Sequence, residues 1–153
     1  MADSKDQTIK KKMTLEVVNP YEVFYEGRIE RIVIPTLDGQ YGIMPGHAPL
    51  VIAVTPGIAR FECDGESQTF AISEGFAEIG QHAVIIVCNA AEWPSEIDTE
   101  RAKSALERAQ ARYNSVTSTE EQRLYARHAI KRAKARITVA AEWKKNKKDH
   151  PYS

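Results

Sequence analysis

The chain has 153 residues, of which 42% are hydrophobic, and its 21 basic side chains balance 21 acidic ones. This length suits one compact domain, or one such domain with an appendage. No apolar run approaches the ~18 residues of a membrane span, and residues 1–6 lack the features of a secretion signal or a transit peptide. We therefore expect no direct membrane insertion, and we expect any membrane association to run through partners.

Residues 13–94 follow a polar N-terminal extension, residues 1–12, and consist of short β-rich runs between turn pairs. Turn signals recur every 8–12 residues or closer with no helical period between them, a pattern typical of a β-sandwich. Alternation within the run Gly57–Cys63 places Ala59, Phe61 and Cys63 inward. Cys63 and Cys88 have no CxxC neighbour, so we expect two buried, reduced core residues. The predicted strands are Thr14–Val18, Glu22–Tyr25, Ile29–Ile34, Gly39–Ile43, Leu50–Ala53, Gly57–Cys63, Ser67–Ile72, Phe76–Ile79 and His82–Val87.

Residues 95–143 change to a period near 3.6, which predicts two helices in an antiparallel hairpin. Ser95 to Asp98 has capping-box spacing, although Asp98 could itself cap the first helix, and Ser118 to Glu121 supplies a second capping box. The tail, residues 144–153, is rich in lysine, and we expect it to be frayed. The predicted apolar stripes are Ala102, Ala105, Leu106, Ala109 and Tyr113 on the first helix, and Ala126, Ala129, Ile130, Ala133, Ile137 and Ala140 on the second.

The seam of this predicted hairpin is built largely of alanine. Each buried methyl-sized group contributes on the order of 0.8 kcal/mol, whereas ordering each backbone residue costs about 1–2 kcal/mol. External contacts could therefore decide whether the hairpin lies folded on the sandwich or extends, although a hairpin that simply stays closed fits the pattern too. The charge also divides after Pro94, with 7 basic and 13 acidic residues before this point and 14 and 8 after it. This asymmetry suggests that the two parts face different partners.

Two motifs identify a family. The segment Asp38–Leu50 places glycines, prolines and a lone histidine at fixed offsets between two apolar runs. The segment Ile97–Ala102 matches the pattern Ile/Leu-Asp-x-x-Arg-Ala. From about Met13 to Trp143, the chain resembles the ε subunit of bacterial F-type ATP synthase, called δ in mitochondria. The resemblance implies a β-sandwich followed by a two-helix hairpin.

The resemblance also implies a site for a regulatory ATP, because some bacterial ε subunits bind ATP through this motif and through arginines of the second helix. Arginines on facing helices could grip a polyphosphate, or they could form a solvated basic face, and the residues alone leave both open. There is no Walker-type loop and no magnesium cluster, so we expect no hydrolysis by this chain, no required cofactor and no metal. The candidates for the ATP site are Glu92, Ile97, Asp98, Arg101, Ala102, Arg108, Arg132 and Arg136.

A second implied site is the contact with the γ shaft and the membrane c-ring, for which the candidates are Asp38, Gly39, Gln40 and His47. Gln40 stands where some relatives carry an acidic residue. His47 has no neighbouring nucleophile or carboxylate, so ordering of the loop by hydrogen bonds is favoured over catalysis. The other histidines are scattered and show no metal-binding spacing.

We therefore expect a non-catalytic rotor subunit, peripheral on the cytoplasmic side of a bacterial inner membrane. Its sandwich would couple the γ shaft to the c-ring during proton- or sodium-driven ATP synthesis. Its basic hairpin, when extended, would place arginines against acidic loops of the catalytic α and β subunits and inhibit ATP hydrolysis.

Two other classes of function are disfavoured. A nucleic-acid-binding module would use the basic helices, but their seam is needed for packing and stacking aromatics are sparse, so we expect no nucleic acid partner. A small hydrolytic or sugar-modifying enzyme would need paired acidic or metal-binding residues, which the sequence does not show.

Overall fold

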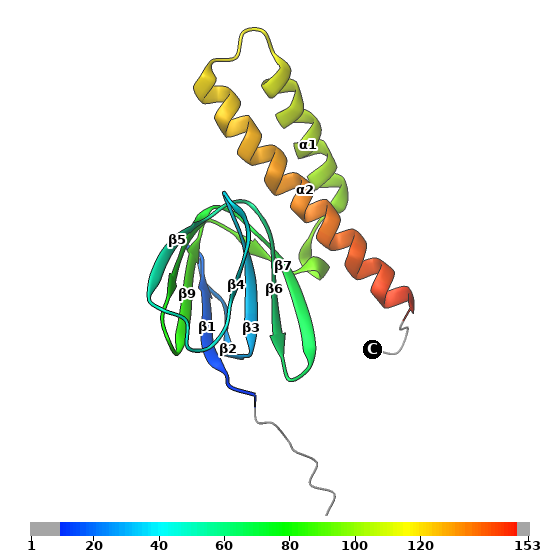
Figure 1. Cartoon of the computed structure of the whole chain (residues 1–153). Helices are drawn as coiled ribbons and strands as arrows, with labels where there is room; N and C mark the ends of the chain where they lie inside the picture. The colour runs from blue at the N-terminus through cyan, green and yellow to red at the C-terminus, as the bar shows by residue number, and fades with distance from the viewer. Residues whose placement is uncertain (1–9, 150–153) are drawn as a thin grey trace, which may run out of the picture.

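The computed structural model describes residues 10–149, and it consists of a β-sandwich followed by a hairpin of two helices (Figure 1). This confirms the predicted fold. Residues 1–9, which make up most of the expected N-terminal extension, and residues 150–153 lie outside the described residues. The strands are β1 (Met13–Val18), β2 (Val23–Ile29), β3 (Arg31–Thr36), β4 (Gly39–Ile43), β5 (Leu50–Val54), β6 (Gly57–Cys63), β7 (Glu66–Ile72), β8 (Gly75–Ile79), β9 (Ala83–Cys88) and β10 (Ala91–Glu92).

The strands form two five-stranded sheets. Sheet A has the order β2-β1-β9-β8-β5, and sheet B has the order β10-β7-β6-β3-β4. Alternate side chains of each strand point between the sheets, as the buried and partly buried residues alternate along β1. The core between the sheets includes Phe61, Phe70, Met13 and Leu15, all fully buried. Burial of each such side chain stabilises the fold by roughly 1.5–3 kcal/mol.

The strand predictions are right to within a few residues, with two omissions and one error. The omissions are β10 and the 3-10 helix η1 (Pro94–Glu96), both too short to show a period. The error is Cys63, which is only partly buried because it ends β6, with its Sγ donating to the Arg28 carbonyl at 3.3 Å. Cys88 is buried as expected, and this burial raises the pKa of its thiol to about 11.

The hairpin consists of α1 (Thr99–Asn114) and α2 (Glu120–Asp149). Asp98 caps α1, and its side chain accepts a hydrogen bond from the Arg101 amide at 3.1 Å. The expected cap at Ser118 is wrong by one residue. Thr119 and Gln122 instead exchange side chain to backbone hydrogen bonds at 2.9 and 3.1 Å, which is a capping box. The expected frayed tail is also wrong from Lys144 to Asp149, because α2 continues through these residues.

Small side chains join the two helices, as the sequence predicts. Ala102 and Ala109 of α1 are buried, as are Ala126, Ala133 and Ala140 of α2. Tyr113, by contrast, is exposed at the end of its stripe. Figure 1 shows the hairpin lying across one end of the sandwich, where α2 packs against β6, β7 and η1.

An aromatic anchor fixes the point where the chain leaves the sandwich. The Trp93 ring stacks on Phe24 with centroids 4.5 Å apart and meets Phe70 edge-on at 5.8 Å. Trp93 directly precedes η1, so the start of the hairpin is held by the core of the sandwich. Beyond this point, α2 also packs against β6 and β7.

Candidate functional site

Among the described side chains, three ion pairs connect α2 to the sandwich. Arg132 lies 3.1 Å from Glu74, Arg136 lies 2.8 Å from Glu92, and Glu142 lies 3.8 Å from Arg60. Arg132 and Arg136 are four residues apart, which places both on one face of the helix. We call the pairs Glu74–Arg132 and Glu92–Arg136 the latch. The third pair is about half exposed on both sides, so it adds little.

Glu74 is the most constrained carboxylate of the latch. It accepts hydrogen bonds from Ser73 Oγ at 2.6 Å, from Asn89 Nδ2 at 3.0 Å, and from Arg132 Nη1 at 3.1 Å to both oxygens. Burial by itself raises the pKa of Glu74, but the hydrogen bonds from Ser73, its own backbone and Asn89, with the charge of Arg132, lower the pKa to about 2. Glu74 is therefore ionised at neutral pH, and most of the groups that stabilise its charge belong to the sandwich.

The second pair of the latch is a charge contact rather than a well-directed hydrogen bond. Arg136 Nε lies 2.8 Å from Glu92 Oε1, but this buried nitrogen has no hydrogen-bond partner of good geometry. Instead, Nη2 of Arg136 donates to Glu92 Oε2 at 3.3 Å. Glu92 is on β10, so the short strand that the sequence did not reveal positions this carboxylate.

Of the eight candidates for an ATP site, Glu92, Arg132 and Arg136 lie together and line one small space. Arg132 and Arg136 face carboxylates, and the space that they line with Ser73 and Glu92 is about 30 Å³, close to the share of one water molecule. The described residues give no side-chain ion pair to Arg101 or Arg108 of α1, and both are exposed. Ile97 ends η1, Asp98 caps α1, and Ala102 is buried in the seam.

The candidates for the ring and shaft contact flank β4, with Asp38, Gly39 and Gln40 where the strand starts and His47 in the loop after it ends. Asp38 lies in the β3–β4 turn and Gly39 and Gln40 begin β4; all three are exposed, and Gly39 has a φ of 107° that suits only glycine well. His47 lies in the loop that follows β4. There the backbone of its neighbour Gly46 donates to Gln81.

His47 orders its loop through both ring nitrogens. Nδ1 lies 2.6 Å from the Ala48 carbonyl oxygen, and Nε2 lies 2.8 Å from the Tyr41 hydroxyl. Because a carbonyl only accepts, Nδ1 carries the proton, and in the neutral ring Nε2 accepts from Tyr41. Both nitrogens are occupied, which is consistent with the ordering role that the sequence favours for His47.

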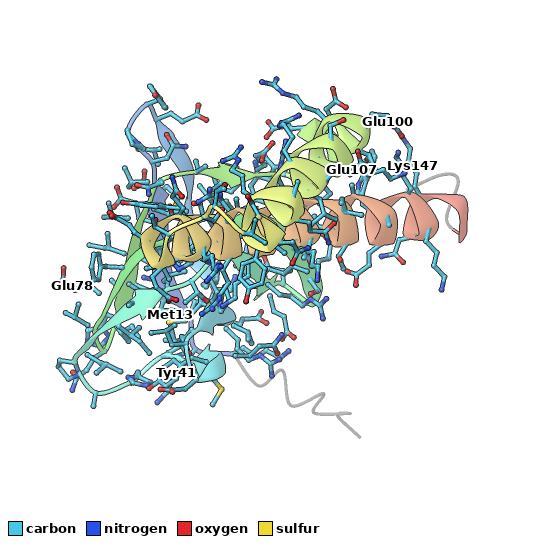
Figure 2. The ribbon with its side chains drawn as sticks, turned by 90° about the horizontal axis from the view of Figure 1, so that it is seen from above. Met13, Tyr41, Glu78, Glu100, Glu107 and Lys147 are labelled. Atoms are coloured by element: carbon cyan, nitrogen blue, oxygen red, sulfur yellow. The ribbon has the colours of Figure 1, made fainter. Side chains whose placement is uncertain are left out.

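The outer face of sheet A is a second candidate site that sequence analysis did not identify. Val87, Phe76 and Ala53 stand in register across β9, β8 and β5, all of them exposed. The parallel row contains the acidic residues Glu26, Glu16 and Glu78 together with Ile85 and Val51. We call these two rows the outer face. Figure 2 shows Glu78 pointing away from the molecule on this side.

The acidic residues of the outer face lack ion pairs in the part of the chain that the structure describes. Glu16 and Glu26 stand directly opposite each other on β1 and β2, a like-charge arrangement that destabilises a sheet. Among residues 10–149, no salt bridge reaches Glu16, Glu26 or Glu78. Phe76 is 62% exposed and Val51 66% exposed beside them. An apolar face with unpaired acidic residues has the character of a binding surface for a basic partner.

The geometry defines a class of protein: a β-sandwich with an exposed, partly acidic face, to which an alanine-seamed basic hairpin is held by a latch of two ion pairs. Two family models match this chain in order. They are "ATP synthase, Delta/Epsilon chain, beta-sandwich domain" over residues 12–94 and "ATP synthase, Delta/Epsilon chain, long alpha-helix domain" over residues 95–141. The chain belongs to the delta/epsilon family of ATP synthase chains.

Curated relatives and solved structures agree with this assignment. The chain is 40% identical over 134 residues to the "ATP synthase epsilon chain" of Caldanaerobacter subterraneus subsp. tengcongensis, covering 87% of this chain and 96% of the relative. It is also 40% identical over 126 residues to that of Shouchella clausii, covering 82% and 92%. A chain in the cryo-EM structure of Euglena gracilis mitochondrial ATP synthase, OSCP/F1/c-ring, is 28% identical with a TM-score of 0.72, over 86% of this chain and 81% of that one. Across the described residues, no helix is long and apolar enough to cross a membrane.

Proposed function

We propose that this chain is a non-catalytic rotor subunit of an F-type ATP synthase, bound to the γ shaft through the outer face of sheet A. The observation that carries this proposal is the outer face itself, where exposed apolar side chains stand beside three carboxylates that form no ion pair with any other described residue. A shaft surface with apolar side chains and Lys or Arg residues would bury the exposed apolar side chains of the outer face and neutralise its carboxylates. The exposed residues Asp38 to Gln40, in the β3–β4 turn and at the start of β4, would then contact the polar loops of the c-ring.

The Euglena structure supports the rotor assignment, because it is an assembly of OSCP, F1 and c-ring that contains a chain of this fold. As a member of such an assembly, the chain would couple shaft and ring during proton- or sodium-driven ATP synthesis. Its place would be peripheral, on the cytoplasmic side of a bacterial inner membrane. The basic hairpin would inhibit hydrolysis when it leaves the sandwich and sets its arginines against acidic loops of the α and β subunits.

A regulatory ATP fits this proposal only as a competitor of the latch. Arg132 and Arg136 are the arginines that would hold its phosphates, and in the closed hairpin Glu74 and Glu92 occupy them. Nucleotide would therefore have to displace at least one carboxylate, which predicts weak binding. Calorimetry with ATP, on the wild-type chain and on Arg136→Ala, tests the site; absence of heat at millimolar ATP would leave the arginines to the latch alone.

The experiment that tests the main proposal is reconstitution of a catalytic head that lacks this chain. We expect Phe76→Asp to weaken binding to the γ-containing head by about a hundredfold, because a charge replaces the largest exposed apolar group of the outer face. Tyr21→Asp is the matched control, since Tyr21 is also an exposed aromatic residue but lies outside the two rows. Equal binding by Phe76→Asp and the wild-type chain would contradict the assignment of the outer face.

A further inference from the structure

A large crevice lies between the outer face and the hairpin. Its volume is about 770 Å³, and its lining is mostly apolar. Phe76 and Val87 of the outer face form one wall, and Leu124 and His128 of α2 form another. Leu37 of the β3–β4 turn borders it as well. The crevice is therefore a continuation of the outer face that the hairpin closes on one side.

Apolar groups from two parts of the molecule are exposed towards this single space. Phe76 is 62% exposed, Leu37 78% and Leu124 51%. A bulky apolar side chain in the crevice would cover Phe76 and Leu124 together only while α2 lies on the sandwich. When the hairpin leaves, Leu124 leaves with it, and the same side chain would contact the sandwich alone.

We infer that the shaft partner seated on the outer face inserts an apolar side chain into this crevice and thereby favours the closed hairpin. This inference rests on the proposed function and adds regulation to it. A ligand that contacts one conformation more extensively than the other shifts the equilibrium towards the first by the difference in binding free energy. The shaft is then a sensor of hairpin position as well as an anchor for the sandwich.

The side chains of the crevice and of the outer face indicate the chemistry of the partner surface that would bind them. Ala53, Phe76 and Val87 belong both to the outer face and to the crevice, so one partner surface reaches both. The adjacent row presents Glu16, Glu26 and Glu78 without ion pairs among the described residues, which selects Lys or Arg beside the apolar insert. The one acidic wall of the crevice, Glu74, is already paired with Arg132 and requires no further cation.

The test uses the full-length chain and the isolated γ subunit of the same enzyme as the probe, without α and β, which would compete for the extended hairpin. Dyes on cysteines introduced at Gln81 and Thr117, in a chain lacking Cys63 and Cys88, report the distance between the far end of the sandwich and the hairpin tip. We expect γ to increase the closed fraction of the wild-type chain. Leu124→Asp should abolish this increase and weaken γ binding about tenfold, because roughly half of a leucine's burial is lost.

Val116→Asp is the matched control, since it adds the same charge to the hairpin at a loop position that is 95% exposed and outside the crevice. It should leave both the γ affinity and the distance response unchanged. If Leu124→Asp behaves like Val116→Asp, or if γ does not increase the closed fraction, the inference is wrong while the outer face stands. If Phe76→Asp binds γ as tightly as the wild-type chain does, the proposed shaft contact itself is wrong.

Discussion

At the scale of single residues, Glu74 and Arg132 form one ion pair but differ in the other interactions that each makes. Glu74 also accepts from Ser73 and Asn89, whereas the structure shows no other ion pair for Arg132 among residues 10–149. Replacing Glu74 therefore leaves sandwich donors without their acceptor, and replacing Arg132 mainly releases the hairpin. The sequence indicates that Arg132 and Arg136 belong to one site, but the carboxylates that they pair with are 58 and 44 residues away in the chain. Such partners follow from the fold and not from local pattern.

The first prediction compares the two sides of this pair. Glu74→Gln should lower the free energy of unfolding by about 1–2 kcal/mol, because Ser73 and Asn89 lose hydrogen bonds to a charged acceptor. Arg132→Met should cost less than about 1 kcal/mol, because roughly a third of each side chain faces solvent, which screens the pair. Urea unfolding followed by tryptophan fluorescence measures both. Equal losses would show that the ion pair, and not the sandwich hydrogen bonds, dominates the role of Glu74.

The second prediction concerns pH. The pKa of Glu74 is about 2 in the folded chain against an ordinary value of 4.5, so its ionised form stabilises the fold. This contribution is complete above about pH 4.5 and is lost as the pH falls through about 2. The difference in unfolding free energy between wild type and Glu74→Gln should therefore be constant from about pH 5 to 7 and shrink below that range. A difference that changes around neutral pH would contradict this origin.

At the scale of elements, local signals predict the fold well and fail where two signals overlap. Turn pairs and alternation locate nine of the ten strands, because both are properties of neighbouring residues. Two possible capping boxes overlap at the start of α2, because Ser118 with Glu121 and Thr119 with Gln122 both have the required spacing. The end of α2 lies beyond the predicted limit, since lysine is a good helix former and Lys147 lies over the Trp143 ring at 5.0 Å.

The third prediction separates the two candidate caps. Thr119→Ala removes the side chain that accepts from the Gln122 amide and should cost about 1 kcal/mol of helix stability. Ser118→Ala should cost less, because Ser118 Oγ only donates to the Arg112 carbonyl at the exposed end of α1. Thermal unfolding of the helical circular dichroism signal measures both variants. A larger loss for Ser118→Ala would show that Ser118, the cap predicted from the sequence, is the residue that stabilises the start of α2.

The fourth prediction tests the alanine seam. Ala133 is 2% exposed, so Ala133→Glu would place a charge without a partner between the helices and should shift the hairpin towards the open form. Lys134→Glu is the control, because the adjacent position is exposed and outside the seam. The dye pair at Gln81 and Thr117 reports the change. If both variants keep the closed distance, the seam does not control the hairpin, and the hairpin is a static element.

At the scale of the whole molecule, the core of the sandwich is built from its own strands. The buried cluster between the sheets runs from Met13 to Cys88, and it includes none of the described side chains of α1 or α2. Trp93 closes that cluster from the last residues before the hairpin. The outer face lies entirely on strands as well. The hairpin contributes the two arginines of the latch and one wall of the crevice.

The last prediction follows from this division. A chain that ends at Pro94 should remain folded, with its unfolding midpoint within a few degrees of the wild-type sandwich, and should still join a head that lacks this subunit. Its affinity for γ should fall by no more than about tenfold, the share assigned to Leu124 in the crevice. ATP hydrolysis by the reconstituted head should rise, because the arginines that would engage the α and β subunits are gone. ATP synthesis coupled to the ion gradient should persist, since the proposed shaft and ring contacts lie on the sandwich. If the truncated chain is folded but cannot bind the head, the shaft contact lies on the hairpin, and the outer face has another partner.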